Sequence, residues 1–203
     1  RLNSDLPKVI NKLAGKPMVS YTINNLRSSG CLNICLVVGY KSWLVKESVG
    51  PSLDFAFQGK PLGTAHAALM GIKNIVNGKT VLVVNGDDSA FYRAETFGDM
   101  FQNHLKSKAV LTIASATIEN PFGLGRIVRG SDGKISKIVE EKEANDEEKE
   151  VKECNIGMYC FDSGWFKENI ELVKRSDCGE YYITDLIKIA VTQKKKVGIF
   201  HLK

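Results

Sequence analysis

The sequence predicts an α/β fold in which a mixed, mainly parallel sheet is covered by helices on both faces. Apolar runs rich in Val and Ile alternate with amphipathic stretches through the first half of the chain, which is the order of repeated strand–helix units. After residue 120 the rhythm changes to alternating strands around an Asp-Gly turn, which adds an antiparallel hairpin. The chain has 203 residues, of which 43% are hydrophobic, so it can form one sizeable domain around a core.

The first half of the chain alternates helix and strand. A helix is expected at 17–29, where Val19, Ile23 and Leu26 recur at helical spacing. The segment NICLVVG (33–39) is continuously apolar and predicts a buried strand. The same reasoning predicts further strands at 53–57, 79–87 and 109–116, and further helices at 41–48, 63–76 and 94–106.

The second half begins with GRIVRGSDGKISKIVEE (125–141), which predicts a hairpin around Asp132-Gly133. Two arginines of this hairpin, Arg126 and Arg129, are expected to face solvent. The acidic run 140–153 is expected to be a solvated surface segment after Lys142. The remaining elements are a strand at 155–162, helices at 163–172 and 182–193, and a last strand at 196–202.

Composition and charge exclude several classes of protein. The net charge is +5 but scattered, and aromatic residues do not alternate with Arg and Lys, so no nucleic-acid partner is predicted. No apolar run is long enough to cross a bilayer, and the polar first residues are not a signal peptide, so no membrane partner is predicted either. Five cysteines without a C-x-x-C pair predict free thiols in a cytoplasmic protein, and no His lies at zinc-ligand spacing from a Cys.

Candidate site residues follow the predicted strands, because ligands bind at the carboxyl ends of the strands in open α/β sheets. The strand VLVV ends at Asn85-Gly86-Asp87-Asp88. Removing a carboxylate from water there costs free energy unless the carboxylate meets a cation or hydrogen-bond donors. Mg²⁺ is a suitable cation for Asp87, since it accepts one or two carboxylates and completes its shell with water and phosphate oxygens. The alternative, that Asp87 or Asp88 simply caps the next turn, is about equally well supported by this stretch.

A second candidate is the turn in FQGKPLGTAHAAL (57–69), where Gln58 precedes a segment with two glycines. Two interpretations stand beside each other: a ligand that needs bare main chain, or turns that need a positive φ. Lys8, after Pro7, is a candidate phosphate ligand, although a surface lysine is the commoner case. His66 is interpreted as a helix-face side chain, and Trp43 and Trp165 as packing residues.

Six stretches occur in an order that resembles a known family. They are RLNSDLPKVINKLAGKPMVSYTI, FQGKPLGTAHAAL, VVNGDD, NPFGLGRIVRGSDGKISKIVEEKEA, CNIGMYCFD and GEYYITDLI. The chain is similar to sugar-phosphate nucleotidyltransferases and most resembles the uridylyltransferase domain of bifunctional N-acetylglucosamine-1-phosphate uridylyltransferases. The resemblance covers nearly the whole chain. It implies a Rossmann-like sheet, Mg²⁺ as cofactor, and UTP and a sugar 1-phosphate as substrates, with pyrophosphate as a product.

The resemblance also implies roles for residues at the phosphates and the base. Arg1 would hold the leaving pyrophosphate, Lys8 phosphate oxygens and Asp87 the Mg²⁺. Gln58, Gly63 and Thr64 would face the uracil, with Gly86 also at the nucleotide. The base would then explain the bare main chain at Gly59 and Gly63, and Gln58 would present a donor and an acceptor together.

On the sugar side, the resemblance implies that Gly125, Glu140 and Asn155 would hold the hydroxyls and the amide of the sugar. Tyr182 and Thr184 would close this side of the site, and Lys142 is a weaker candidate for the sugar phosphate. Two alternatives remain: a nucleotidyltransferase that uses another nucleoside triphosphate with glucose or mannose 1-phosphate, and a non-catalytic regulatory module that binds a nucleotide sugar.

The domain organisation follows from the same comparison. Residues 1–203 are expected to form a single nucleotidyltransferase domain that lacks the family's N-terminal strand and Gly-rich loop, which belong at the centre of the sheet, and its C-terminal metal-ligand segment. The chain does not begin with Met, so it is expected to start within a longer protein. Assembly into a homo-oligomer is left open.

Overall fold

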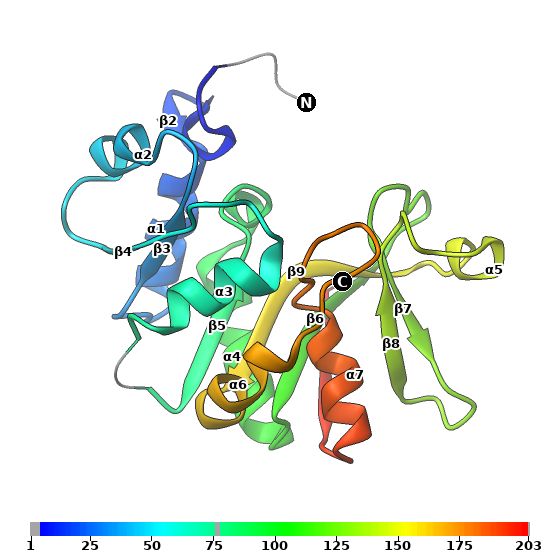
Figure 1. The fold of residues 1–203 in the computed structure, drawn as a ribbon. Coiled ribbons are helices and arrows are strands. Elements are labelled where there is room, and N and C mark those ends of the chain that lie inside the picture. The colour runs from blue at the N-terminus through cyan, green and yellow to red at the C-terminus, as the bar shows by residue number, and fades with distance from the viewer. Residues whose placement is uncertain (1–4, 76–77, 203) are drawn as a thin grey trace.

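The computed structural model describes residues 5–75 and 78–202, which form a mixed α/β structure (Figure 1). Its helices are α1 (Met18–Ser28), α2 (Ser42–Val49), α3 (Thr64–Ile72), α4 (Ala94–Ser107), α5 (Asp146–Lys149), α6 (Ser163–Asn169) and α7 (Asp185–Thr192), with 3-10 segments η1 (Lys8–Ile10), η2 (Asp88–Phe91) and η3 (Ile170–Leu172). Its strands are β1 (Lys12–Leu13), β2 (Lys16–Pro17), β3 (Cys35–Val38), β4 (Asp54–Phe57), β5 (Thr80–Val84), β6 (Leu111–Thr117), β7 (Gly125–Arg129), β8 (Ile135–Val139), β9 (Glu153–Asp162) and β10 (Val197–Leu202).

The main sheet has six strands in the order β10-β6-β9-β7-β8, with β5 also paired to β9. Strand β10 runs parallel to β6, whereas β9 is antiparallel to β5, β6 and β7. Strands β5, β6, β7 and β10 therefore share one direction, and β8 and β9 run the other way. This arrangement confirms the predicted mixed sheet.

The long strand β9 organises the site because β5 and β7 share one of its edges. Strand β5 ends where Val84 lies opposite Met158, and β7 begins where Gly125 lies opposite Asn155. Residues Ile156 and Gly157 lie between these two pairings. The turn after β5 and the turn before β7 thus meet at one stretch of β9.

A second, smaller sheet holds β3 and β4 as a parallel pair, with Val38 opposite Phe57. Its apolar side chains pack with those of η1, α1 and α2 in a cluster that includes Val19, Ile23 and Val45. No hydrogen-bonded strand pairing joins this sheet to the main sheet among the described residues. That the family's first strand belongs at the centre of the sheet stays a prediction.

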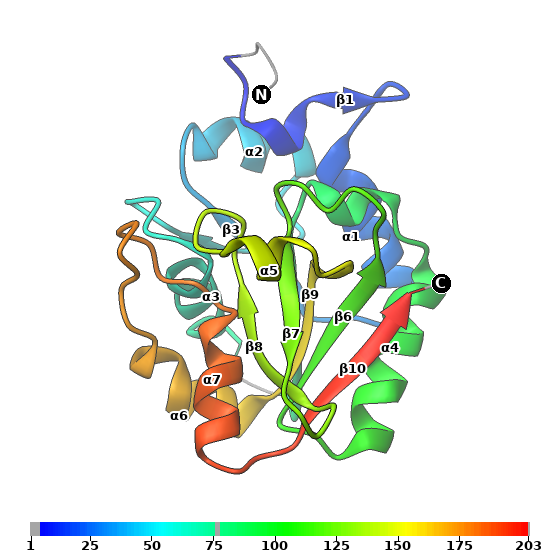
Figure 2. The same ribbon diagram turned by 90° about the vertical axis from the view of Figure 1, so that its right-hand side faces the viewer.

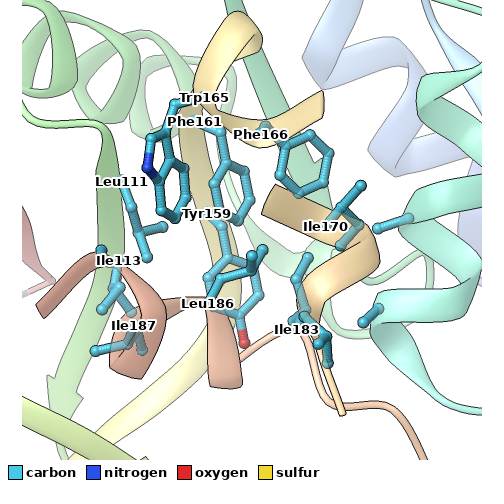
Figure 3. Packing of buried hydrophobic residues seen from close by; sticks show 14 of the residues in the cluster. Leu111, Ile113, Tyr159, Phe161, Trp165, Phe166, Ile170, Ile183, Leu186 and Ile187 are labelled. Atoms are coloured by element: carbon cyan, nitrogen blue, oxygen red, sulfur yellow. The ribbon is translucent and has the colours of Figure 1, made fainter. Parts of the chain in front are cut away.

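Helices cover both faces of the main sheet (Figure 2). On β9, Tyr159 and Phe161 face one side, where they pack with α3, α6 and α7 (Figure 3). Met158 and Cys160 face the other side, where they pack with α1 and α4. This alternation is the two-residue period of a strand buried on both faces.

The predicted elements after residue 17 are found within a few residues of their expected ends. The helix predicted over 63–76 ends at Ile72, and residues 76–77 lie outside the described residues. The helix predicted over 163–172 is α6 followed by η3. The acidic run contains α5, which Asn145 begins with a capping box involving Glu148, and most of its residues after Lys142 are exposed, as expected.

The predictions for four side chains have mixed outcomes. Trp165 is buried in the main core as expected, but Trp43 is 63% exposed and belongs to none of the core clusters of the described residues. The prediction that Arg126 faces solvent is wrong, since its side chain is 2% exposed, whereas Arg129 is partly exposed and pairs with Glu153. The difference arises because the turn before β7 and Glu141 cover the first residues of that strand.

All five cysteines are free, as predicted. Cys154 and Cys160 are buried, and burial raises the pKa of both thiols, that of Cys160 to about 12. Within the residues that the structure describes, no helix is both long and apolar enough to traverse a lipid bilayer.

Candidate active site

One cavity of about 1190 Å³ collects most of the predicted site residues. It extends from the apolar side chains between β3 and β5 to the turns at the ends of β5 and β8. The predicted residues that line it are Lys8, Thr64, Gly86, Gly125, Glu140, Asn155, Tyr182 and Thr184. Gln58, Gly63 and Asp87 adjoin these residues through hydrogen bonds or in sequence.

Lys8 and Asp87 form an ion pair at the carboxyl end of β5. Lys8 Nζ lies 2.5 Å from Asp87 Oδ2, while Asp87 Oδ1 accepts a hydrogen bond from the Asp88 backbone N–H. Burial works to raise the pKa of Asp87, but the hydrogen bonds from Lys8 and Asp88 outweigh it and the pKa is lowered. The same hydrogen bond to Asp87 raises the pKa of Lys8. Asp87 is thus ionised, and its carboxylate contacts both the Lys8 ammonium and the Asp88 backbone N–H.

The donor set at Asp87 suits a metal ion that is shared with phosphate. The Asp87 side chain is 21% exposed, so an ion from solvent can reach it. Among the described residues, no group of three or more His, Cys, Asp or Glu side chains could enclose a metal. Mg²⁺ bound through one or two carboxylates, water and substrate phosphate needs no such enclosure. The cap interpretation is confirmed by the Asp88 hydrogen bond to Oδ1, while Oδ2 already meets a cation, the Lys8 ammonium.

The turn after β4 fixes the Gln58 side chain from two sides. The Gln58 backbone N–H donates to Val38 O at 2.8 Å. Its side-chain Nε2 lies 3.1 Å from Gly63 O and 3.0 Å from His66 Nδ1. Gly63 O is a carbonyl and can only accept, so it places the amide nitrogen inward. Gln58 Oε1 has no hydrogen-bond partner among the described residues, so Gln58 offers an acceptor and not the expected donor and acceptor together.

A glycine is required at position 63 because the backbone of another segment lies against it. Gly63 has φ +106°, and a Cβ there would lie 2.5 Å from Tyr181 O and 2.7 Å from Tyr181 N. At Gly59 a Cβ would only make ordinary contact with the Phe57 ring at 3.4 Å. A base resting on the chain is therefore not what excludes a side chain at Gly63, and the positive-φ interpretation holds there.

Segment 181–184 is hydrogen-bonded to this turn. Tyr181 N–H donates to Leu62 O at 2.8 Å, and Ala65 N–H donates to Tyr181 O at 2.9 Å. Thr64 Oγ1 accepts from the Ile183 backbone N–H at 2.9 Å. The Thr64 hydroxyl oxygen therefore supports the neighbouring segment, which continues to Thr184, a residue predicted to lie on the sugar side.

Glu140 lies at the end of β8 and faces this same segment. Thr184 Oγ1 donates to Glu140 Oε1 at 3.1 Å. Burial raises the pKa of the Glu140 carboxyl, which the Thr184 hydrogen bond only partly opposes. A Cβ at Gly125 would lie 3.0 Å from Ile138 Cγ2 and 3.3 Å from Glu140 Oε2. Gly125 thus leaves room for this carboxylate at the cavity wall.

Asn155 is held within β9. Its Nδ2 donates to the Tyr159 hydroxyl at 2.6 Å, and its Oδ1 accepts from the Gly157 N–H at 3.2 Å. Gly157 has φ +73°, and a Cβ there would lie 2.5 Å from Asn85 Nδ2. Gly157 therefore allows the turn after β5 to approach β9 closely. The carboxamide of Asn155 is oriented before any ligand arrives.

An ion pair that the sequence analysis missed supports the turn before β7. The buried Arg126 Nη2 lies 2.7 Å from Glu141 Oε2, which also accepts from the Gly123 N–H at 3.1 Å. Arg126 Nη1 donates to Leu124 O. These contacts fix residues 123–125 against the end of β8. The only signal in the sequence was an arginine at the second position of β7 together with the Glu140-Glu141 pair directly after β8.

Two predicted residues gain no support from the structure. Arg1 lies outside the described residues, so its predicted role is not addressed. Lys142 is exposed, does not line the cavity, and has no hydrogen bond or ion pair with another described residue. Its assignment to a sugar phosphate gains no support from this structure.

A Rossmann-like α/β fold with an acid, a lysine and a polar turn at the carboxyl ends of its strands defines a class of nucleotide-binding proteins. The chain belongs to the nucleotidyl transferase family, whose model matches residues 2–203. It is 37% identical over 204 residues to the bifunctional protein GlmU of Streptococcus agalactiae serotype V, covering 100% of this chain and 44% of that one. It is 40% identical over 198 residues to the bifunctional protein GlmU of Carboxydothermus hydrogenoformans, covering 97% and 44%. The chain therefore spans less than half the length of these curated relatives.

Proposed function

We propose that the protein joins UTP and N-acetylglucosamine 1-phosphate to give UDP-N-acetylglucosamine and pyrophosphate. The observation that carries this proposal is the single cavity lined by both predicted halves of the site. Lys8 and Gly86 line it on the side predicted for the nucleotide, and Glu140, Asn155 and Thr184 line it on the side predicted for the sugar. Family membership and similarity to the GlmU proteins support the same assignment.

At the base, the acceptor Gln58 Oε1 suits a ring N–H. Uracil carries a donor N–H where cytosine carries a bare ring nitrogen. When Gln58 Oε1 faces the ligand, it can accept a hydrogen bond from the uracil N–H, and it repels the bare ring nitrogen of cytosine. The orientation of the Gln58 amide, held by Gly63 O, supports UTP over CTP.

At the phosphates, Lys8 is placed to exchange partners. In the free protein its ammonium pairs with Asp87, and an arriving triphosphate offers it oxygens with more negative charge. Asp87 is then left to hold Mg²⁺ together with those phosphate oxygens. When bound, Mg²⁺ neutralises the negative charge that develops on the phosphates.

The transfer itself needs positioning more than proton removal. A phosphate oxygen of the sugar 1-phosphate attacks the α-phosphorus of UTP. The bond from that phosphorus to the bridging oxygen breaks, and pyrophosphate leaves with the electron pair. A phosphate monoester dianion is already a nucleophile, so no general base is required, and orientation with charge neutralisation supplies the catalysis.

At the sugar, Glu140 provides a carboxylate acceptor for hydroxyl groups, and the nearby Thr184 hydroxyl holds one of its oxygens. Gly125 allows the sugar ring to approach the main chain. We place Tyr182 on the open side of this region, and we place the protein in the cytoplasm, which its free thiols support.

The test is pyrophosphate release by the full-length protein with Mg²⁺ and each combination of nucleoside triphosphate and sugar 1-phosphate. UTP with N-acetylglucosamine 1-phosphate should give the highest kcat/KM. Faster release with dTTP or GTP and glucose or mannose 1-phosphate would instead establish one of the alternative transferases. Tight binding of a UDP-sugar without turnover of any pair would establish the regulatory module.

A further inference from the structure

We infer that His66 is a specificity-determining positioning residue, which selects the nucleobase by fixing the orientation of the Gln58 amide. The inference rests on the proposed function, because it concerns how the same base site distinguishes uracil from cytosine. His66 lies in the first turn of α3, and its Nδ1 is 3.0 Å from Gln58 Nε2. This contact extends its role beyond that of a helix-face side chain.

The hydrogen-bond inventory around Gln58 determines the tautomer of His66. A glutamine amide nitrogen carries two N–H donors, and two neighbours lie within hydrogen-bond distance of it. Gly63 O takes one, and it also accepts the Ala67 N–H at 3.1 Å as the first bond of the helix. The second amide N–H points to His66 Nδ1, which must then be the unprotonated nitrogen. His66 therefore carries its proton on Nε2.

The consequence lies at the opposite end of the amide. With both N–H groups used, Gln58 Oε1 is the group left to meet a ligand. Turning the amide over would set Oε1 against Gly63 O and remove the donor from His66 Nδ1. The turned amide would present N–H groups outward, which suit the bare ring nitrogen of cytosine. His66 and Gly63 O thus act together against CTP.

Two substitutions separate the hydrogen bond from the bulk of the side chain. His66→Leu removes the acceptor while keeping a helix-forming residue of similar size. His66→Asn keeps an acceptor oxygen near the position of Nδ1. Loss of one hydrogen bond should lower the ratio of kcat/KM for UTP to that for CTP about five- to tenfold. His66→Asn should restore most of the ratio, and KM for the sugar 1-phosphate should not change in either variant.

The decisive control places His66→Leu in a Gln58→Ala background in the full-length protein. If His66 acts through Gln58, the second substitution should leave the UTP-to-CTP ratio where Gln58→Ala already put it. An undiminished effect in the double variant would overturn the inference, as would unchanged discrimination in His66→Leu alone. A wild-type protein without UTP turnover would refute the proposed function and not the positioning.

A second measurement does not depend on activity. The chain has three His, so ¹⁵N-labelled histidine gives few imidazole signals, and His66→Asn identifies the relevant pair by its absence. The expected spectrum has an unprotonated Nδ1 and a protonated Nε2 for His66. A proton on Nδ1 would overturn the proposed orientation, because that nitrogen would then donate and the amide oxygen would face it.

Discussion

The substitution Gly63→Ala tests whether the turn after β4 is built around the backbone of Tyr181. Gly63 has φ +106°, in a region that L-residues rarely adopt. The added methyl would lie 2.5 Å from Tyr181 O, so the backbone of segment 181–184 would have to move. That movement would strain the hydrogen bonds that Tyr181 forms with Leu62 and Ala65.

The expected cost has two parts. Holding a non-glycine residue in such a backbone conformation costs about 1–3 kcal/mol. Weakening the two Tyr181 backbone hydrogen bonds adds about 1 kcal/mol each. The free energy of unfolding should therefore fall by about 3–5 kcal/mol, which for a chain of this size lowers the melting temperature by about 10 °C. The KM for UTP and that for the sugar 1-phosphate should both rise, because Thr184 belongs to the displaced segment.

The assay is thermal unfolding followed by circular dichroism, with initial rates of pyrophosphate release measured beside it. The matched control is Gly98→Ala in α4, where an added Cβ meets nothing within 4 Å. That substitution should raise stability by about 0.5–1 kcal/mol, because alanine loses less conformational entropy in a helix. Equal melting temperatures for wild type and Gly63→Ala would refute the steric argument.

The other predictions concern single side chains. Asp87→Asn should abolish turnover with the melting temperature retained, and rates like those of the wild type would remove Asp87 from the metal site. Gln58→Ala should bring kcat/KM for CTP close to that for UTP, and unchanged discrimination would argue against its contact with the base. Burial raises the pKa of Glu140 in the folded protein above its value in the unfolded chain. The contribution of this raised pKa to the stability of the folded protein is fully present at pH values below the ordinary carboxyl range, and it is lost as the pH rises through the folded-state pKa. Glu140→Gln should therefore raise stability at pH 7 and flatten its dependence on pH while raising KM for the sugar 1-phosphate; a less stable variant at pH 7 would contradict this.

Local pattern was enough to predict most of the fold. The spacing of Val19, Ile23 and Leu26 predicts α1, and these side chains are buried in the structure. The apolar runs that become β5 and β9 are buried on both faces, as continuous hydrophobicity indicates. These features depend on neighbours in sequence, so periodicity reveals them.

Features that depend on contacts distant in sequence could not be predicted in this way. Arg126 is buried because Glu141 and the turn at 123–125 close over it, and nothing in its strand indicates a buried partner. Gly63 is next to Tyr181, 118 positions away in the sequence, so the sequence could not decide between a ligand and a positive φ as the reason for this glycine. His66 appeared to be an ordinary helix residue, and only the fold brings its ring to Gln58.

Segment 181–184 connects the two halves of the candidate site. Its first residue is hydrogen-bonded on both sides to the turn that holds Gln58, and its last residue donates to Glu140. If the proposed function is correct, with the base at that turn and the sugar at Glu140, four consecutive residues set the distance between the two. In-line transfer requires the sugar phosphate and the α-phosphate to meet with little freedom, so a short, hydrogen-bonded connection between the two regions would serve the proposed reaction directly. It also explains why glycine is needed at position 63, where the two segments touch through their main chains.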